Sequence, residues 1–357
     1  MEMIFGAPQF YVQGPGIIAK TGKYLTDLQL DGKLLLMIDV GVKEVVKPML
    51  VSIEEASIDY DVLDFADQYT LKKIALIADE SKHKQYCAVV GVGGGKPIDA
   101  SKRVGWSLGI PFLSVPTSIA TDAATSRTSV AYTDDGELVE DKTIFNPAGI
   151  FVDSAIIVRA PIHLFGAGMA DALSKRYEYK LSLACGFPNW YDASSAYFID
   201  AISKEMHELL LRNGRYLKEC FREGVLNETV ERSITAMLLM SRLVWDSGGL
   251  RGAHDLFEEF NDAGYGKDHM HGEIVGYFDL VQLLVEQYPD NEFYELYTLY
   301  RDLGIPLKIS DFGFPIGDAD QLDELTTRFS KKCGEFNWHP GDDAFKDALL
   351  KLEKMQL

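Results

Sequence analysis

Three consecutive glycines, Gly93, Gly94 and Gly95, follow an apolar run and precede Lys96. Because glycine has no Cβ, the backbone N–H groups of such a loop can approach a phosphate closely. Residues 97–106 have a helical pattern, and a helix N-terminus adds partial positive charge to the full charge of Lys96. The segment predicts a pyrophosphate site, although a tight strand-to-helix turn without a ligand would use the same residues. It matches neither the G-x-G-x-x-G fingerprint nor a P-loop.

Asp39 ends the apolar run at residues 34–39. A carboxylate at the end of a strand can accept hydrogen bonds from the ribose diol of a dinucleotide. It also repels a 2′-phosphate, and therefore favours NAD over NADP. Aspartate at such a position is also a common cap or turn residue, so the residue alone does not distinguish the two roles.

Asp171, His254 and His271 offer one carboxylate and two imidazoles. This ligand set leaves a fourth coordination position open, as catalytic zinc sites do. The three residues are far apart in the sequence, so only the fold could bring them together. Histidines are more often surface or satisfied core residues, and the spacing by itself leaves both interpretations open.

The segments around the glycines and Asp39 alternate between apolar runs and helical patterns. Strands that alternate with helices indicate a mostly parallel sheet with helices on its faces. The expected strands are residues 34–41, 57–65 and 111–117, residues 86–96 are an expected strand that runs into the glycine loop, and residues 72–82 are an expected helix.

The pattern changes near Ala160 and Pro161. Beyond this point apolar residues recur at three- and four-residue spacing, which predicts amphipathic helices over residues 194–221, 228–245 and 272–288. We therefore expect an α/β Rossmann-like N-terminal domain over residues 1–160 and an all-α domain over residues 161–357. An active site would be expected in the cleft between them.

The composition restricts the classes of partner. The 357 residues have a formal net charge of -19, which disfavours nucleic acid and anionic membranes. The four cysteines form no CxxC pair, and the N-terminal residues lack the features of a signal peptide. No apolar run is long enough for a transmembrane helix. These features predict a cytoplasmic protein that acts on a small molecule.

Several segments together resemble glycerol dehydrogenases, which belong to a wider group with iron-type alcohol dehydrogenases and dehydroquinate synthase. The resemblance covers nearly the whole chain. Its segments, in order, are YVQGPG, GVGGGKPIDASK, residues 115–137, GMADAL, SGGLRGAH and HGE.

This resemblance implies a dehydroquinate synthase-like fold, with NAD bound by residues 1–160 and Zn2+ and substrate bound by residues 161–357. It also implies a homo-oligomer. The zinc ligands would be Asp171, His254 and His271, and Asp122 would orient the substrate. The implied cofactor contacts are Asp39, Gly93, Gly94, Gly95, Lys96, Thr117, Ser126 and Tyr132.

The implied reaction is oxidation of a secondary hydroxyl of a polyol, such as glycerol to dihydroxyacetone, with hydride transfer to NAD. Zinc would act as a Lewis acid that lowers the pKa of the hydroxyl. Iron-type alcohol dehydrogenases place a fourth ligand, a histidine, where this chain has Lys175. A protonated lysine cannot bind a metal, which argues for a zinc site with three protein ligands.

The chain departs from typical glycerol dehydrogenases at several positions that line the site in relatives. Basic residues in such positions favour a carboxylate or phosphate, so the substrate could be a hydroxycarboxylate or a glycerol phosphate. Alternatively, these residues pair with nearby carboxylates such as Asp255 and Glu178. The departures are Ala120, Arg127, Thr128, Ser174, Lys175, Arg176, Arg251, Phe257 and Glu258, of which Lys175, Arg127 and Arg251 are candidate substrate contacts.

Two other functional classes use the same residues. A dehydroquinate synthase-like lyase would use NAD only transiently, but that class usually has glutamate at the position of Asp171. A binding protein without activity would not need three ligand types together with a glycine loop.

Overall fold

The computed structural model describes residues 2–66, 70–134, 138–141, 145–341 and 343–355. Its contacts divide the chain into two compact units. An α/β unit consists of Gly6–Pro161 and Cys220–Arg242, and a helical unit consists of Met1–Phe5, Ile162–Glu219 and Leu243–Leu357. The sequence predicts two continuous domains, 1–160 and 161–357, and the units differ from that division in two segments.

The first of these segments is the N-terminus, which belongs to the helical unit. Met3 forms a parallel β-bridge with Ser194. The side-chain amide of Asn189 donates a hydrogen bond of 2.9 Å to the carbonyl oxygen of Ile4. The polar backbone of this segment is therefore satisfied by helical-unit residues.

The second segment, Cys220–Arg242, belongs to the α/β unit. Within it the carboxylate of Glu231 accepts hydrogen bonds from Gln13, at 2.7 Å, and from Ser154. Its helical pattern is visible in the sequence, but an amphipathic pattern does not reveal which neighbour the apolar face contacts.

All six strands of the main sheet are parallel, which confirms the predicted sheet type. Their order across the sheet is β1 (Tyr11–Gly14), β8 (Gly149–Asp153), β5 (Phe112–Pro116), β4 (Ala88–Gly93), β2 (Leu34–Asp39) and β3 (Tyr60–Phe65). The chain passes from β2 to β3 on one side, and β4 lies on the other side of β2. The strand order therefore reverses between β2 and β4. In open parallel sheets the crevice at this point, at the carboxyl ends of the strands, is where ligands bind.

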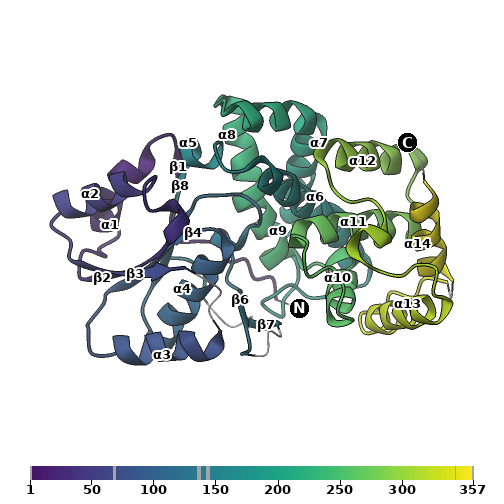
Figure 1. Cartoon of the computed structure of the whole chain (residues 1–357), viewed down its shortest axis with the longest axis horizontal. Coiled ribbons are helices and arrows are strands. Elements are labelled where there is room, and N and C mark those ends of the chain that lie inside the picture. The colour runs from purple at the N-terminus through teal and green to yellow at the C-terminus, as the bar shows by residue number, and fades with distance from the viewer. Residues whose placement is uncertain (1, 67–69, 135–137, 142–144, 342, 356–357) are drawn as a thin grey trace. The chain divides into compact units, whose positions relative to one another are not determined.

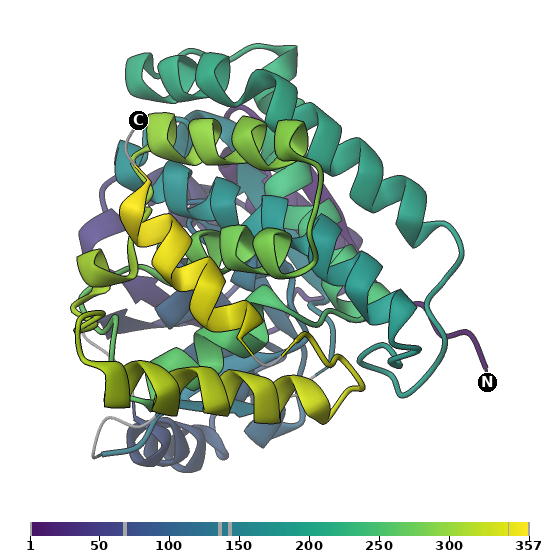
Figure 2. The same ribbon diagram turned by 90° about the vertical axis from the view of Figure 1, so that its right-hand side faces the viewer.

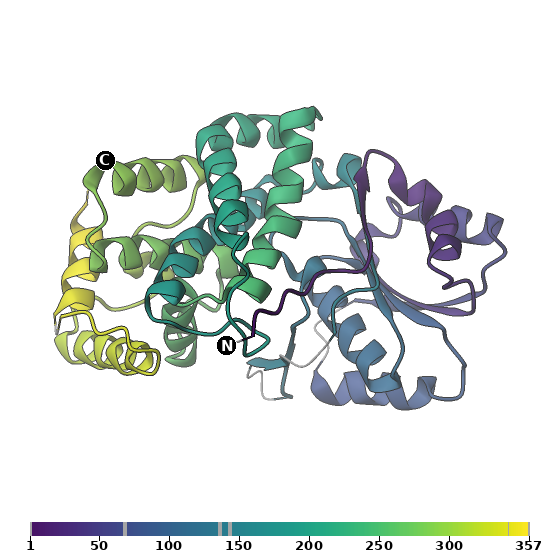
Figure 3. The same cartoon turned by 180° about the vertical axis from the view of Figure 1, so that it is seen from behind.

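Helices cover both faces of this sheet (Figures 1 and 3). Alternate residues of β2 point to opposite faces, so Leu34 and Leu36 belong to one hydrophobic cluster and Leu35 and Met37 to another. The first cluster includes residues of α2 (Lys47–Glu55), next to α1 (Thr21–Asp27), and the second includes residues of α3 (Leu71–Ser81) and α4 (Gly95–Leu108).

The remaining elements of the α/β unit are short. An antiparallel pair of strands follows β5. The sequence predicts one helix over residues 228–245, but a π-helical turn interrupts it. The short elements are η1 (Ile17–Lys20), η2 (Val40–Val42), η3 (Ala123–Thr125), β6 (Ser129–Tyr132), β7 (Leu138–Asp141), α5 (Ser154–Ile157), α8 (Glu228–Thr235), the π-helical turn (Ala236–Met240) and the start of α9 (Ser241–Gly248).

The helical unit is built around α11 (His271–Val285), which contacts α6 (Ile162–Ala184), α10 (Ala253–Asp262), α12 (Asp290–Leu303) and α14 (Ala344–Lys354). Figure 2 views this unit with α14, drawn in yellow, toward the reader and α13 (Ala319–Gly334) below it. The long α7 (Ile199–Glu223) and the 3-10 turn η5 (Ile309–Phe312) complete the elements. Among the described residues, no helix is long and apolar enough to cross a membrane.

Candidate active site

Two glycines allow α11 and α6 to lie very close together. A Cβ on Gly272 would lie 2.0 Å from the carbonyl oxygen of Ala167, and a Cβ on Gly276 would lie 2.7 Å from the Cβ of Ala170. Neither position can hold a larger residue without moving one of the helices apart. This approach places His271, the first residue of α11, beside the middle of α6.

Asp171 on α6, His254 on α10 and His271 bring their side chains to one point. His254 Nε2 lies 3.3 Å from Asp171 Oδ1 and 3.3 Å from His271 Nε2, and the third side of the triangle, from His271 Nε2 to Asp171 Oδ1, is 3.9 Å. Ligands about 2.0–2.2 Å from a tetrahedral zinc ion lie roughly 3.3–3.6 Å from one another. The three atoms therefore fit one small divalent ion.

A second observation supports the fit. Asp171 Oδ1 is buried and accepts no well-aligned hydrogen bond, and the polar atoms beside it are Lys175 Nζ and His254 Nε2, each 3.3 Å away. A metal ion would complete the interactions of this buried carboxylate oxygen. Asp171 and His254 are buried, whereas the side chain of His271 is 35% exposed.

The charges of the centre keep Asp171 ionised. Burial opposes the ionisation of Asp171, but Lys175 and the two histidines hold its pKa well below its usual range. Burial also opposes the charged form of His254, but Glu178 and Asp171 raise its pKa to about 9. A metal would therefore meet a ready carboxylate and would displace a proton from His254.

Two aromatic rings hold the histidines in place. Trp245 meets His254 edge to face, with centroids 4.4 Å apart, and Phe257 meets His271 in the same way at 4.5 Å. Phe257, one of the departures expected from the sequence, thus packs against a candidate ligand.

The basic residues near the centre are mostly paired. Arg176 lies 2.6 Å from Asp200, and Arg251 lies 2.7 Å from Asp255 while its guanidinium stacks on Phe187 at 3.7 Å. The sequence suggests that four basic residues could bind an anionic substrate. Asp200 and Asp255 neutralise two of them, Arg176 and Arg251.

The other two basic residues lie in different units. Lys175 is buried with its Nζ 3.3 Å from Asp171 Oδ1. Arg127 is half-buried in the α/β unit, two residues before β6. Tyr132 ends β6 and forms a bridge with Thr70, and burial raises the pKa of its hydroxyl. Residues 135–137, which end the resembling segment 115–137, lie outside the described residues.

The glycine loop follows β4 at the carboxyl edge of the sheet, beside the end of β2. Gly93 has φ +141°, and a Cβ there would lie 2.7 Å from Pro97 and 2.8 Å from Asp39. A Cβ on Gly94 or Gly95 would meet nothing closer than 3.4 Å. Only Gly93 is thus required by the fold itself, and the other two keep the backbone uncovered.

Helix α4 starts at Gly95, two residues before the predicted start at Pro97. Its N-cap, Gly94, makes no side-chain cap, so the first N–H groups of the helix have no intrahelical partners. Lys96 is exposed in the first turn. This N-terminus is suited to a phosphate.

Asp39 and Thr117 flank the loop. Asp39 Oδ1 accepts a hydrogen bond of 2.8 Å from the N–H of Gly41, which is the capping role that the sequence also allows. The N–H of Thr117 donates to the carbonyl oxygen of Gly93 at 3.0 Å. The candidate cofactor contacts Asp39, Thr117 and the glycines thus occupy one edge of the sheet.

Lys102 of α4 binds the segment that follows β5 through hydrogen bonds. Its buried Nζ donates to Asp99 Oδ1 at 2.9 Å, Ser126 Oγ at 2.6 Å and the carbonyl oxygens of Ala123 at 2.5 Å and Thr128 at 2.8 Å. An ammonium has only three protons, so these four acceptors share them. Ser126, a candidate cofactor contact, is buried and held by this lysine.

Asp122 begins the turn that Lys102 holds. Its Oδ2 accepts a hydrogen bond of 2.8 Å from Ser241, and Arg242 Nη1 lies 3.8 Å from its Oδ1. Arg242 also donates to Thr128 Oγ1 at 3.0 Å. Ser241 and Arg242 directly follow the π-helical turn, and such turns often occur at functional sites.

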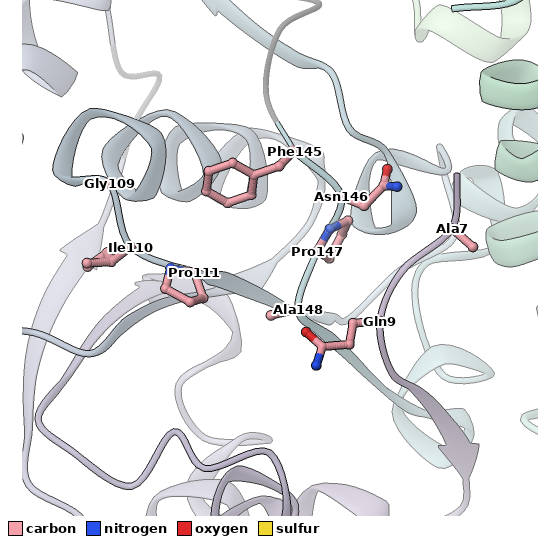
Figure 4. A pocket seen from close by; sticks show the side chains of 9 residues that line it. All are labelled: Ala7, Gln9, Gly109, Ile110, Pro111, Phe145, Asn146, Pro147 and Ala148. Atoms are coloured by element: carbon pink, nitrogen blue, oxygen red, sulfur yellow. The ribbon is translucent and has the colours of Figure 1, made fainter. Parts of the chain in front are cut away.

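A separate hollow lies at the opposite edge of the sheet (Figure 4). It has a volume of about 360 Å³ and lies where chain segments enter β1, β5 and β8. Ligands of parallel α/β sheets bind at the carboxyl edge, so this hollow is not the expected dinucleotide site. Its lining residues are Ala7, Gln9, Gly109, Ile110, Pro111, Phe145, Asn146, Pro147 and Ala148.

Comparison with known proteins establishes the family. A family model described as iron-containing alcohol dehydrogenase matches residues 12–161. Glycerol dehydrogenase 1 of Schizosaccharomyces pombe is 30% identical over 333 residues, which cover 90% of this chain and 72% of that protein. The chain belongs to the iron-containing alcohol dehydrogenase family.

Other relatives of this oxidoreductase match along most of their length. Glycerol dehydrogenase of Citrobacter freundii is 29% identical over 315 residues, 88% of this chain and 86% of that one. The solved structure of a probable glycerol dehydrogenase from Sinorhizobium meliloti 1021 has a TM-score of 0.85 and 26% identity, and covers 98% of each chain. The predicted family and fold class are confirmed.

Four residues that contact candidate site residues have no role at the site in the sequence-based prediction. Glu178 lies two turns after Asp171 on α6, and Lys102 lies one turn after Asp99 on α4, so helical spacing could have indicated both. Ser241 and Arg242 carry no such signal, because their contacts with Asp122 depend on the fold. The structure does not change the list of candidate ligands.

Proposed function

We propose that this enzyme is an NAD- and zinc-dependent polyol dehydrogenase that oxidises a secondary hydroxyl of a vicinal diol such as glycerol. The observation that carries the proposal is the close triangle formed by Asp171 Oδ1, His254 Nε2 and His271 Nε2. Relatives from Citrobacter freundii and Schizosaccharomyces pombe that match most of the chain are named glycerol dehydrogenases. Glycerol is a neutral diol, so these names favour a neutral substrate over an anionic one. The ion pairs of Arg176 with Asp200 and of Arg251 with Asp255 favour the same substrate class, because they neutralise two candidate anion-binding groups.

The donor set favours zinc over iron at this centre. Asp171, His254 and His271 would hold the ion, and Lys175 stands where a fourth histidine would otherwise be needed for an iron-type site. When bound, zinc supplies a Lewis acid that makes the substrate hydroxyl acidic, and it takes up no electrons itself.

The α/β unit supplies the groups for a dinucleotide. The uncapped N-terminus of α4, with Gly94, Gly95 and Lys96, would hold the pyrophosphate. Asp39 would accept from the ribose diol and exclude a 2′-phosphate, which favours NAD over NADP. Thr117, Ser126 and Tyr132 complete the proposed contacts with the cofactor.

Asp122 would orient the substrate. Ser241 donates a hydrogen bond to one of its carboxylate oxygens, and Arg242 Nη1 lies 3.8 Å from the other. An ionised carboxylate is an acceptor for two hydroxyl groups, and a vicinal diol offers such a pair. Correct orientation of the carbinol carbon is worth large rate factors.

The decisive test is an assay of the zinc-loaded protein. NADH formation would be followed with glycerol, 1,2-propanediol, a 2-hydroxycarboxylate and glycerol phosphate, each with NAD and with NADP. We expect a clear preference for a neutral diol and for NAD. A preference for either anionic substrate would overturn the assignment of the alcohol, and absence of net NADH would favour a lyase. Gel filtration of the same preparation would test the homo-oligomer that the family resemblance implies.

Ligand variants test the metal centre itself. Asp171→Ala and His271→Ala should lose both zinc and turnover, because each removes one of three protein ligands. His269→Ala is the matched control, since His269 lies two residues from His271 but pairs with Glu273 at 3.5 Å. Full activity in either ligand variant, or metal loss in the control, would contradict the ligand assignment.

A further inference from the structure

The face of α6 that carries Asp171 continues with three polar residues that are also buried, Ser174, Lys175 and Glu178. Residues three, four and seven positions apart lie on one face of a helix. Each of these side chains contacts the candidate metal ligands or a neighbour of them. Burying several polar groups costs free energy unless they bind partners, so their contacts indicate a role at this site.

Glu178 holds His254 at two points. Its Oε1 accepts the backbone N–H of His254 at 2.8 Å, and its Oε2 lies 2.7 Å from the ring Nδ1. Ser174 Oγ donates to the same Oε2 at 3.0 Å. With Nδ1–H donating to the carboxylate, Nε2 is the nitrogen left to bind a metal, and the carboxylate makes it a stronger donor.

Lys175 contacts the other buried ligand. Its Nζ lies 3.3 Å from both carboxylate oxygens of Asp171, and its side chain is 1% exposed. The ammonium also lies 5.5 Å from the centroid of the Trp245 ring. A fixed positive charge at this distance attracts the carboxylate that a metal would need, and it repels the metal itself.

We propose that Glu178 and Lys175 are positioning residues that set the metal affinity of the centre in opposite directions. Glu178 strengthens binding by orienting His254 and by making its Nε2 a stronger electron donor to the metal. Lys175 weakens binding by sharing Asp171 and adding one positive charge. The inference rests on the proposed metal centre, but not on the identity of the alcohol or of the cofactor.

The opposite signs separate this role from simple packing. Both side chains are buried, so a purely structural role would make loss of either one harmful to metal binding. The opposite charges of Glu178 and Lys175 predict opposite effects, because the electrostatic interaction of a buried group with a divalent ion is only weakly screened. Removing the carboxylate must then weaken binding, and removing the ammonium must tighten it.

The test compares Glu178→Gln and Lys175→Met with the control Arg176→Met. The control removes the same charge from the same helix, but from a side chain that pairs with Asp200. Zinc affinity would be measured without substrate by competition with a chromogenic chelator, and the visible spectrum of the Co2+-loaded proteins would report the ligand geometry. Melting temperatures of the metal-free variants would show that they are folded.

We expect Glu178→Gln to bind zinc roughly 10–100-fold more weakly and to show an altered Co2+ spectrum. Lys175→Met should bind about tenfold more tightly or better, and Arg176→Met should stay within about twofold of the parent. Should Lys175→Met not fold, Lys175→Gln carries the same expectation. Equal shifts in one direction, or none, would refute the inference even if the parent binds zinc normally. Absence of zinc binding in the parent would instead refute the proposed metal centre.

Discussion

Single buried charges in this enzyme are held by specific partners. Asp122 accepts a hydrogen bond from Ser241 and lies near Arg242. Lys102 forms an ion pair with Asp99, and Asp171 forms one with Lys175. A buried charge is tolerated only with such partners, and removal of one partner leaves the other uncompensated. Substitutions at these positions therefore test chemistry and stability at once, so each needs a control for folding.

Asp122→Asn is expected to lower kcat/KM for the polyol by roughly 10–100-fold, because hydrogen bonds to a charged acceptor are the stronger ones. Asparagine keeps the shape of the side chain but not the charge beside Arg242. Zinc affinity should not change, since Asp122 is not a candidate ligand. Steady-state kinetics and a chelator titration of one preparation provide the check. Unchanged kcat/KM would rule out a substrate contact for Asp122.

His207 predicts a dependence of stability on pH. Burial, with a smaller effect of Arg176 and Lys180, lowers the pKa of this imidazole from 6.5 to about 4. Between these values the unfolded chain binds a proton that the folded chain does not. The free energy of unfolding should therefore fall as the pH falls from 6.5 to 4, by roughly 1–3 kcal/mol.

The control for this effect is His207→Phe, which keeps an aromatic ring against Tyr177, whose centroid lies 5.1 Å away. Urea unfolding of the parent and the variant at several pH values provides the measurement. A variant with the same loss of stability on acidification as the parent would assign the effect to other groups.

The candidate ligands illustrate what a sequence does and does not reveal about a residue. Asp171, His254 and His271 come from three helices, and no spacing along the chain predicts that they meet. Their residue types suit a zinc site, but only the resemblance to a family singled them out as the implied ligands. Glu178 shares a helix with Asp171, so its position on the same face was predictable, but its contact with His254 on α10 was not.

At the scale of elements, the apolar runs predicted the strands well because buried parallel strands are continuously hydrophobic. The strand expected at residues 57–65 is shorter, Tyr60–Phe65, and it lies at the edge of the sheet, where burial imposes a weaker pattern. The helix expected at residues 228–245 is interrupted by the π-helical turn. Apolar spacing could not reveal this turn, because one extra residue per turn changes the periodicity only locally.

The loop before α4 gives a prediction that separates folding from binding. Gly93→Ala should destabilise the protein by about 1–3 kcal/mol, because φ +141° is strained for alanine and its Cβ would collide with Pro97 and Asp39. Gly94→Ala should keep the melting temperature, since its Cβ meets only Ser118 at 3.8 Å.

Gly94→Ala should nevertheless weaken NAD binding by at least about tenfold, because its methyl group covers backbone that would approach the pyrophosphate. Differential scanning fluorimetry and fluorescence titration with NADH measure the two effects. If Gly94→Ala binds NADH like the parent, the loop is only a turn.

At the scale of the whole molecule, each unit is assembled from separated parts of the chain. The α/β unit needs Cys220–Arg242 in addition to Gly6–Pro161. A fragment that ends at Pro161 would leave Gln13 and Ser154 without the carboxylate of Glu231. It would also leave the turn at Asp122 without Ser241 and Arg242.

We therefore expect the fragment 6–161 to be less stable than the same fragment joined by a flexible linker to residues 220–242. The difference should be at least about 2 kcal/mol, since several buried polar groups lose their partners. Urea unfolding followed by circular dichroism compares the two proteins. Equal midpoints would show that the added segment contributes nothing to the stability of the unit.

The discontinuous make-up of the α/β unit also matters while the protein is being made. A ribosome releases the chain from its N-terminus, and domains generally fold as they emerge. Here the strands of the sheet emerge well before the segment that completes their unit, and α6 and most of α7 are synthesised in between. Until Arg242 has left the exit tunnel, Gln13, Ser154 and Asp122 therefore lack the partners that Glu231 and Ser241 provide, and in this interval of translation chaperones would matter most.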